Sequence, residues 1–168
     1  MSVETVLGLW KNARSGFVSE AESIPEDKFT FKPTPETRSV AELLQHVIGA
    51  QKFFVGEACR PEANILRRPF SEHTKAYGEG VDDVFDKACL IELMRNSMDE
   101  AERMIITNAV GLNEMMTGPD GSQQTKLAFL TFGMSHEMYH RGQLTVYERL
   151  LNIEPALTKM FREMTAAQ

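Results

Sequence analysis

The sequence predicts an all-α protein, a four-helix bundle, with long loops after its first and second helices and a short helix near its C-terminal end. Four long segments repeat apolar residues at intervals of three and four, as amphipathic helices do. No stretch between them alternates apolar and polar residues as a strand would. Long helices joined by one short and two long connections are typical of a bundle. We expect a single domain over residues 1–168.

The composition excludes several classes of protein. Hydrophobic residues make up 42% of the chain and charged residues 25%, as in ordinary globular proteins. The net charge of -6 argues against a nucleic-acid partner, and no apolar run reaches the roughly 18 residues of a membrane span. The N-terminus has no basic start followed by an apolar core, so we expect a cytoplasmic protein without a membrane partner. In that compartment Cys59 and Cys89 are expected to be reduced thiols without a catalytic role.

The first helix is predicted over residues 2–23, with apolar residues, Trp10 among them, on one face. Trp10 is expected in the core, and a stacking role in a pocket stays open because its buried N–H needs a partner. Pro25 ends the helix, and two further prolines keep residues 24–38 extended. The first connection is therefore a long loop.

The second helix begins at a capping box, in which Ser39 and Glu42 satisfy free backbone donors of the first turn. His46 lies on the margin of the apolar stripe of this helix. A lone histidine in such a position is ordinarily a packed residue that bonds to a backbone carbonyl. The interpretation of His46 therefore depends on the other histidines.

Residues 60–80 lose the helical period and contain two prolines and two glycines, which predicts a second long loop that could cover a site. His73 falls within it, and we expect a solvated surface histidine. A third long helix follows over residues 84–109.

A turn signal, Gly-Pro-Asp-Gly at residues 118–121, leads toward a fourth helix that is expected to start at Ser122 or Gln123 and to end near Leu151. Residues 156–163 are predicted to form the short final helix, ahead of an unfixed tail.

Two histidines on the fourth helix point to function. His136 and His140 lie about 40° apart on one helix face, near enough to share a metal ion, and this face turns toward the core. An unpartnered buried imidazole is destabilising by roughly 1–3 kcal/mol, so the pair needs a metal, a carboxylate or water. His46 is the natural third ligand, whereas His73 is not. Histidines that only hydrogen-bond in the core remain the alternative.

Three neighbours of the pair are candidate site residues. Gly133 leaves space where a ligand could enter, or else lets two helices pack closely. Gln143 could hydrogen-bond near the site or form an ordinary contact between helices. Glu137 completes an H-E-x-x-H motif, in which zincin proteases use the glutamate as general base, but that class needs a third ligand downstream and a scaffold with strands. For Glu137 a general-base role, an orienting role and a salt bridge on the helix flank all stay open.

The back of the fourth helix carries an apolar strip of Leu127, Met134 and Met138, which predicts a homodimer if it is exposed in the monomer. Arg141 points about 100° away from His140, so we expect it to pair with a carboxylate rather than to touch a metal.

Two segments resemble the DinB/YfiT-like superfamily. Residues 136–144, HEMYHRGQL, resemble the signature of the last core helix of that family. Residues 38–47, RSVAELLQHV, resemble its second-helix segment, which carries the first metal histidine. Prolines ahead of that helix also match, so the resemblance extends over most of the chain.

The resemblance implies a four-helix bundle in which three histidines, matching His46, His136 and His140, hold a divalent metal, usually zinc or nickel. Water or substrate fills the other coordination positions. Family members include thiol-dependent S-transferases, which use low-molecular-weight thiols such as bacillithiol or mycothiol, a maleylpyruvate isomerase, and proteins described as metal hydrolases. For this chain it implies a metal-dependent transferase or hydrolase that acts on a small molecule. A non-catalytic bundle that binds a metal or a small ligand is the alternative.

Overall fold

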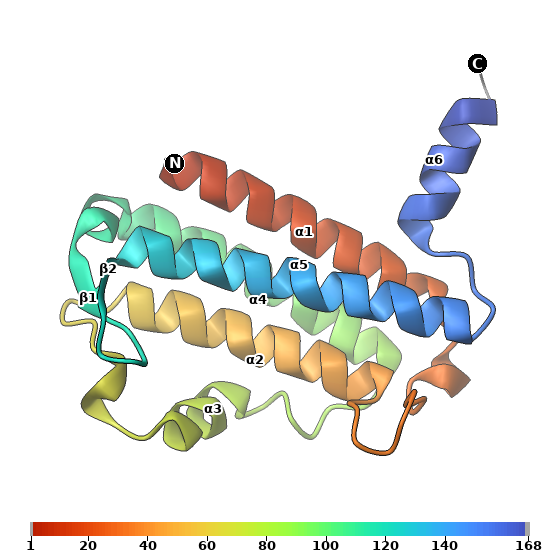
Figure 1. The fold of residues 1–168 in the computed structure, drawn as a ribbon, viewed down its shortest axis with the longest axis horizontal. Coiled ribbons are helices and arrows are strands. Elements are labelled where there is room, and N and C mark those ends of the chain that lie inside the picture. Colours follow the sequence, from red (N-terminus) through yellow and green to blue (C-terminus); the bar gives the residue numbers. More distant parts are fainter. Residues whose placement is uncertain (1, 167–168) are drawn as a thin grey trace.

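The computed structural model describes residues 2–166 and has at its centre four long helices (Figure 1). Each of these helices packs mainly on two of the others, so that α1 and α2 lie diagonally across the bundle. The all-α four-helix fold predicted from the sequence is confirmed. The four helices are α1 (Val3–Ser23), α2 (Val40–Ala58), α4 (Lys87–Thr107) and α5 (Lys126–Leu150).

The ends of the helices follow the local signals in the chain. The Ser2 hydroxyl accepts the Thr5 N–H at the start of α1. The capping box predicted for α2 is present, because the Ser39 hydroxyl accepts the Glu42 N–H and the Glu42 carboxylate accepts the Ser39 N–H. After α1, the chain passes Pro25 into a short 3-10 turn, η1 (Glu26–Lys28), and the long loop that was expected.

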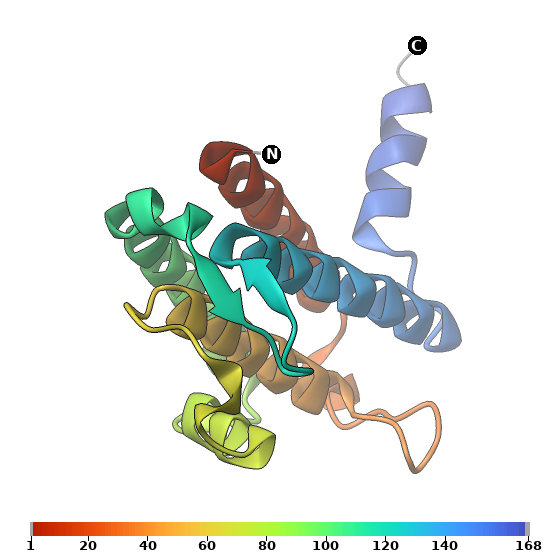
Figure 2. The ribbon, with the colours of Figure 1, turned by 60° about the vertical axis from the view of Figure 1, so that its left-hand side comes forward.

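The connection before α5 contains a hairpin that the sequence did not predict (Figure 2). Strands β1 (Met115–Thr117) and β2 (Gln123–Thr125) pair in antiparallel fashion around the predicted turn, where Gly121 has a φ of 82°. α5 consequently begins at Lys126, later than expected, with the Thr125 hydroxyl as its N-cap. Strands of three residues are too short to show an alternating pattern, so only their turn was visible in the sequence. A 3-10 turn, η3 (Ala109–Asn113), joins α4 to this hairpin.

The expected loop over residues 60–80 is in fact partly helical. It contains η2 (Ile65–Arg67) and a nine-residue helix, α3 (Phe70–Gly78), which packs on α2. The prediction that His73 is a solvated surface residue is wrong, because His73 is fully buried on the inner face of α3. Only two residues of α3 are buried, which gives the helix no apolar period to recognise.

His73 is held by polar partners from outside its own helix. Its Nε2 lies 2.9 Å from the Ile65 carbonyl oxygen, and Arg68 Nε donates to its Nδ1 at 3.2 Å. A carboxylate oxygen of Glu57, on α2, also lies 3.2 Å from Nδ1. These contacts fix α3 against α2.

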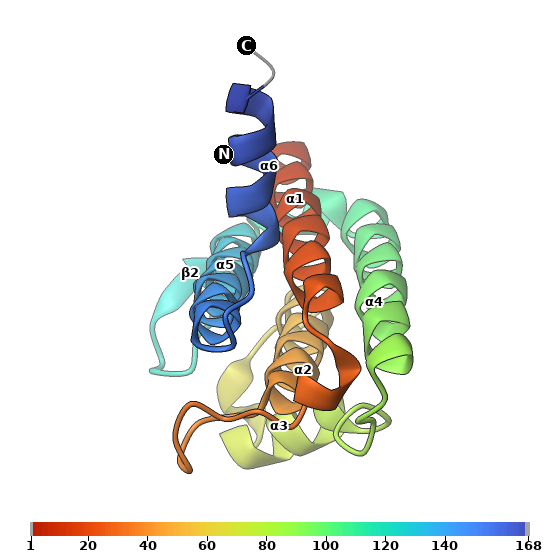
Figure 3. The ribbon, with the colours of Figure 1, turned by 90° about the vertical axis from the view of Figure 1, so that its right-hand side faces the viewer.

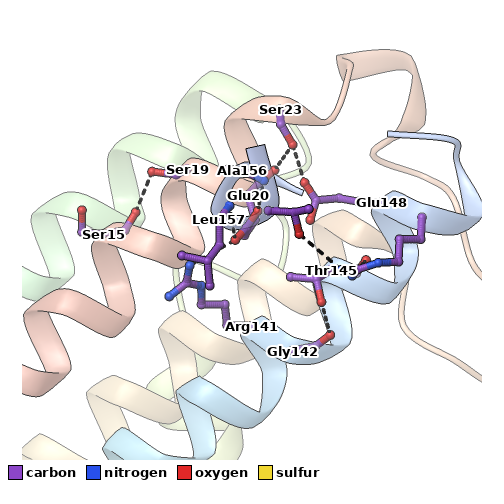
Figure 4. A network of polar contacts seen from close by, with 12 residues as sticks. Ser15, Ser19, Glu20, Ser23, Arg141, Gly142, Thr145, Glu148, Ala156 and Leu157 are labelled. Atoms are coloured by element: carbon purple, nitrogen blue, oxygen red, sulfur yellow. Dashed lines mark hydrogen bonds and ion pairs between the residues drawn. The ribbon is translucent and has the colours of Figure 1, made fainter. Parts of the chain in front are cut away.

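The short helix α6 (Ala156–Ala166) projects away from the bundle (Figures 1 and 3). Three residues of the expected tail belong to it, and residues 167–168 lie outside the described range. Figure 4 shows how its first turn is attached: the Glu20 carboxylate, on α1, accepts the N–H groups of Ala156 and Leu157. Glu20 also accepts Arg141 Nη2 at 3.1 Å, which confirms the carboxylate partner expected for Arg141.

The apolar strip that predicted a homodimer is largely covered within one chain. Leu127 and Met134 are half-buried against the core, and only Met138 is exposed. This covering removes most of the apolar area on which the homodimer prediction depended, and sedimentation is the test of that prediction. None of the helices in residues 2–166 combines the length and apolar character that a membrane crossing requires.

Candidate metal centre

Three histidines from two helices meet in the structure. His46 comes from α2, and His136 and His140 come from α5, which packs beside α2. The Nε2 atom of His46 lies 3.3 Å from that of His136 and 3.1 Å from that of His140, and the Nε2 atoms of His136 and His140 are 3.2 Å apart. Three ring nitrogens thus converge on one point.

These separations fit a shared divalent ion. Imidazole nitrogens bind zinc at about 2.0–2.1 Å, so two of them on one ion, about 90–109° apart, lie roughly 2.9–3.4 Å from each other. All three separations fall within this range. The donor set is neutral and contains imidazole alone, which suits zinc and nickel better than magnesium or calcium.

A chain of hydrogen bonds settles which nitrogen of His140 is free. The Tyr147 hydroxyl donates to the Arg38 carbonyl oxygen at 3.0 Å, and Gln143 Nε2 donates to that hydroxyl at 2.9 Å. The amide oxygen of Gln143 therefore faces His140 Nδ1, at 2.9 Å. The Arg38 carbonyl oxygen can only accept, so the Tyr147 hydroxyl donates to it and accepts from the Gln143 amide nitrogen. The Gln143 amide oxygen then accepts from His140, which therefore carries its hydrogen on Nδ1. Its Nε2 lone pair is left pointing at the other two histidines.

The electrostatic surroundings keep the three imidazoles neutral. Burial lowers the pKa of His46 to about 3 and that of His136 to about 4, with smaller contributions from Arg38 and the neighbouring rings. Burial also lowers the pKa of His140, partly opposed by its bond to Gln143. Metals bind the neutral imidazole, so the cluster is ready to act as a ligand set at neutral pH.

A groove of about 1600 Å³ opens beside the histidines. His46 and His136 line it, together with residues from the loop before α2, from α3 and from the turn of the hairpin. The long second connection therefore does contribute to the walls of the site, as expected, but through a helix. A small molecule of ordinary size could be accommodated in this volume.

Gly133 and Glu137 lie near the histidines in sequence but outside this groove. A Cβ at Gly133 would lie 2.7 Å from Phe54 Cγ and 2.9 Å from Trp10 Cη2, so its place in the structure corresponds to close helix packing. Both carboxylate oxygens of Glu137 accept hydrogen bonds from Arg14, and one also accepts the Trp10 N–H at 2.6 Å. Glu137 is thus engaged in a buried ion pair between α5 and α1. The zincin arrangement, in which this glutamate works at the metal, does not match these contacts.

The sequence did not reveal the roles of Tyr147 and Arg38, which orient His140, or of Arg14, which pairs with Glu137. Tyr147 falls on the same helix face as His140, four residues after Gln143, and this spacing could have indicated a polar chain. Arg38 belongs to the segment that resembles the family, but its carbonyl role depends on a helix far away in the sequence. Arg14 had no local signal, because a charged residue on a buried helix face is paired only by tertiary contacts.

The cysteines take no part in the cluster. Cys59 is half-buried and Cys89 exposed, and both are free thiols. Burial raises the pKa of Cys59 to about 11, which disfavours the reactive thiolate.

The sequence profile of the DinB superfamily matches residues 9–144, which is most of the chain. The chain belongs to this superfamily. Among curated proteins it is similar to an uncharacterised protein, YjoA, from Bacillus subtilis (strain 168), with 24% identity over 77% of each chain.

Solved structures show the same fold. The crystal structure of the DinB-like protein YjoA from Bacillus subtilis matches with a TM-score of 0.67 and 20% identity, covering 88% of this chain and 92% of that one. A DinB-like protein from Bacillus cereus ATCC 10987 matches with a TM-score of 0.69 and 13% identity, covering 90% of this chain and 94% of that one. At these identities the likeness extends to the fold alone.

Proposed function

We propose that this protein is a metal-dependent enzyme in which His46, His136 and His140 hold one divalent ion, zinc or nickel. The observation that carries the proposal is the convergence of three Nε2 atoms at 3.1–3.3 Å, one of them fixed as a bare acceptor by Gln143. Catalytic zinc sites typically have three protein ligands and an open position, whereas structural sites have four.

The reaction class we propose is a thiol-dependent S-transfer or a hydrolysis on a small molecule. A bound ion of this kind would hold a thiol as thiolate or lower the pKa of bound water toward 7. The chain itself contributes the orientation of His140, the half-buried position of the rings and the groove that receives a substrate. Membership of the DinB superfamily supports the choice, because its characterised members include low-molecular-weight-thiol transferases.

One observation favours a second candidate, a bundle that binds a metal or a small ligand without turnover. The acidic residue nearest the histidines in sequence, Glu137, is fully engaged with Arg14 and Trp10 and is not available as a general base. An S-transfer needs no such base if the thiol binds as thiolate, whereas hydrolysis gains from one. The engagement of Glu137 therefore also ranks the transferase above the hydrolase.

Elemental analysis of protein purified without a histidine tag tests the metal directly. We expect about one equivalent of zinc or nickel in the wild type, and loss of the metal in the His46→Ala, His136→Ala and His140→Ala variants. His73→Ala is the matched control, because it removes a histidine that the structure places outside the cluster. A wild-type protein without bound metal, even after incubation with excess zinc or nickel, would contradict the proposal.

Turnover distinguishes the enzyme from the binding protein. The metal-loaded protein is assayed with a panel of low-molecular-weight thiols and electrophiles, and with ester and amide substrates. Turnover that disappears in His140→Ala supports the enzyme. Stoichiometric binding without turnover across the whole panel supports the second candidate.

A further inference from the structure

The lining of the groove beside the histidines contains a series of aromatic rings. Phe70, Phe53, Phe54 and Phe132 follow one another with ring centroids 5.3–5.7 Å apart. The ring of His136 lies 5.8 Å from that of Phe54, so the aromatic series reaches the histidine cluster. Arg38 also belongs to the lining of this groove.

Two members of the aromatic series are unusually exposed. The side chains of Phe70 and Phe132 line the same groove from α3 and α5, with exposed fractions of 58% and 61%. Large exposed apolar side chains that share one concave surface mark a binding site for an apolar group. A ligand group that packs on these rings is therefore expected to be apolar.

Arg38 supplies a positive charge without a protein counter-ion. In the described range, residues 2–166, no carboxylate forms an ion pair with its guanidinium, while the neighbouring cation Lys32 is paired with Glu42. Arg38 lines the groove together with His46 and His136, and its charge contributes to lowering the pKa of all three histidines.

The backbone of Arg38 is also tied to the cluster. Its carbonyl oxygen is the last acceptor of the chain that runs from His140 through Gln143 and Tyr147. This chain holds the start of α2 at a set position relative to His140. An exposed arginine on a fixed backbone, next to neutral ligands, is suited to pairing with a planar anion.

We propose that the ligand of this groove is an organic anion with an apolar body, whose carboxylate-like group pairs with Arg38 and whose body packs on Phe132 and Phe70. The inference rests on the proposed function, since it names the class of molecule that the metal site acts on. Three neutral ligands leave the charge of a divalent ion uncompensated, so the ion and Arg38 together favour an anion. Arg38 and Phe132 are specificity-determining residues in this view.

Calorimetric titration of the zinc-loaded protein with three probes tests the proposal at low salt. The probes are 3-phenylpropionate, its neutral amide and propionate. We expect the wild type to prefer 3-phenylpropionate over the amide, and Arg38→Gln to reduce that preference by about tenfold, as expected for loss of one charge-assisted hydrogen bond. Arg103→Gln, which removes an exposed cation of α4 outside the groove lining, should leave the preference unchanged.

The same titrations test the contact between the apolar body of the ligand and the aromatic rings of the groove. Phe132→Ala should lower the preference for 3-phenylpropionate over propionate roughly tenfold. Val146→Ala, a truncation of an exposed apolar residue on α5 outside the groove lining, should not. All variants change exposed side chains, and thermal unfolding checks that they fold.

The outcomes separate the two proposals. The inference is overturned if Arg38→Gln keeps the full wild-type preference for the carboxylate, which would mean that the ion alone selects the anion, or if the wild type shows no preference. Metal content is measured in the same samples. Absence of metal would count against the proposed function, and the Arg38 and Phe132 comparisons would still be decided on the metal-free chain, because neither residue is a metal ligand.

Discussion

The chain contains two buried or half-buried histidine sites with opposite surroundings. At His73 both ring nitrogens face protein groups, since Nε2 lies 2.9 Å from the Ile65 carbonyl oxygen and Nδ1 lies 3.2 Å from Glu57 and Arg68. At the three-histidine cluster each Nε2 atom faces the other rings, and within residues 2–166 it contacts no other polar group. Burial alone therefore does not distinguish a candidate metal ligand from a structural histidine. The partners of the ring nitrogens make that distinction.

The two sites also differ in charge. Glu57 is fully buried and gathers Arg67, Tyr77 and His73 around its carboxylate, which makes a closed network that joins α2 to α3. The cluster contains no carboxylate, and Arg38 is the charged residue that acts on it. The Glu57 network stabilises the packing of α3 on α2. The three-histidine cluster has no such closed set of protein partners, and its ring nitrogens could bind an ion.

The largest expected effect is on metal binding by the cluster. His140→Ala should weaken zinc or nickel binding by more than a hundredfold, because about 3–4 kcal/mol is gained per ligand in structural zinc sites. The unfolding free energy of the metal-free protein should change less than the metal affinity, because the lost ring donates one hydrogen bond, to Gln143, and otherwise packs on neighbouring rings. Competition with a chromophoric chelator and urea denaturation measure the two quantities. Unchanged metal affinity would mean that the cluster is not the site.

At His73 we expect the stability of the protein to change and its metal binding to stay the same. His73→Ala should lower the free energy of unfolding by about 2–3 kcal/mol, because it removes the buried partner of the Ile65 carbonyl oxygen and of Arg68 Nε and leaves a cavity beside Glu57. Metal content should stay at the wild-type level. Urea denaturation and elemental analysis provide the measurement, and loss of metal without loss of stability would reverse the assignment of the two sites.

A smaller effect on metal affinity tests the hydrogen bond that orients His140. Gln143→Leu should weaken metal binding by about 10–100-fold, since it removes the acceptor that keeps the hydrogen of His140 on Nδ1. Gln45→Leu is the matched control, because Gln45 also lines the groove but donates to the Val84 carbonyl oxygen. Equal metal affinities in the two variants would show that Gln143 does not orient the ligand.

The smallest expected effect is the pH dependence of the unfolding free energy. Solvent reaches part of the cluster and weakens the contribution of its histidines to stability. An unfolded chain binds protons at its histidines below about pH 6.5, but the folded protein keeps the pKa of His136 near 4 and that of His46 near 3. The unfolded state then binds more protons, so the unfolding free energy of the metal-free protein should fall as pH drops from 6.5 toward 4. Urea midpoints should fall less steeply in His46→Gln. An identical slope in both proteins would contradict the lowered pKa.

The sequence by itself determined the four long helices and the candidate ligands, because the signals for both are local. Apolar residues every three or four positions, together with Ser39 and Glu42 in a capping box, specify where helices form and start. Four-residue spacing places His136 and His140 on one face whatever the rest of the chain does. The prediction of a shared site with His46 then needed only that the two helices be neighbours, which a bundle provides.

Only the tertiary structure decided what each polar residue does. His73 and Glu57, and likewise Glu137 and Arg14, owe their roles to partners from other segments of the chain. The orientation of His140 is set by the Arg38 carbonyl, more than a hundred residues before Tyr147, which bonds to it. A hydrogen bond or an ion pair is satisfied by whichever groups the packed helices bring within about 3 Å of each other. Those groups are known only once the helices have packed.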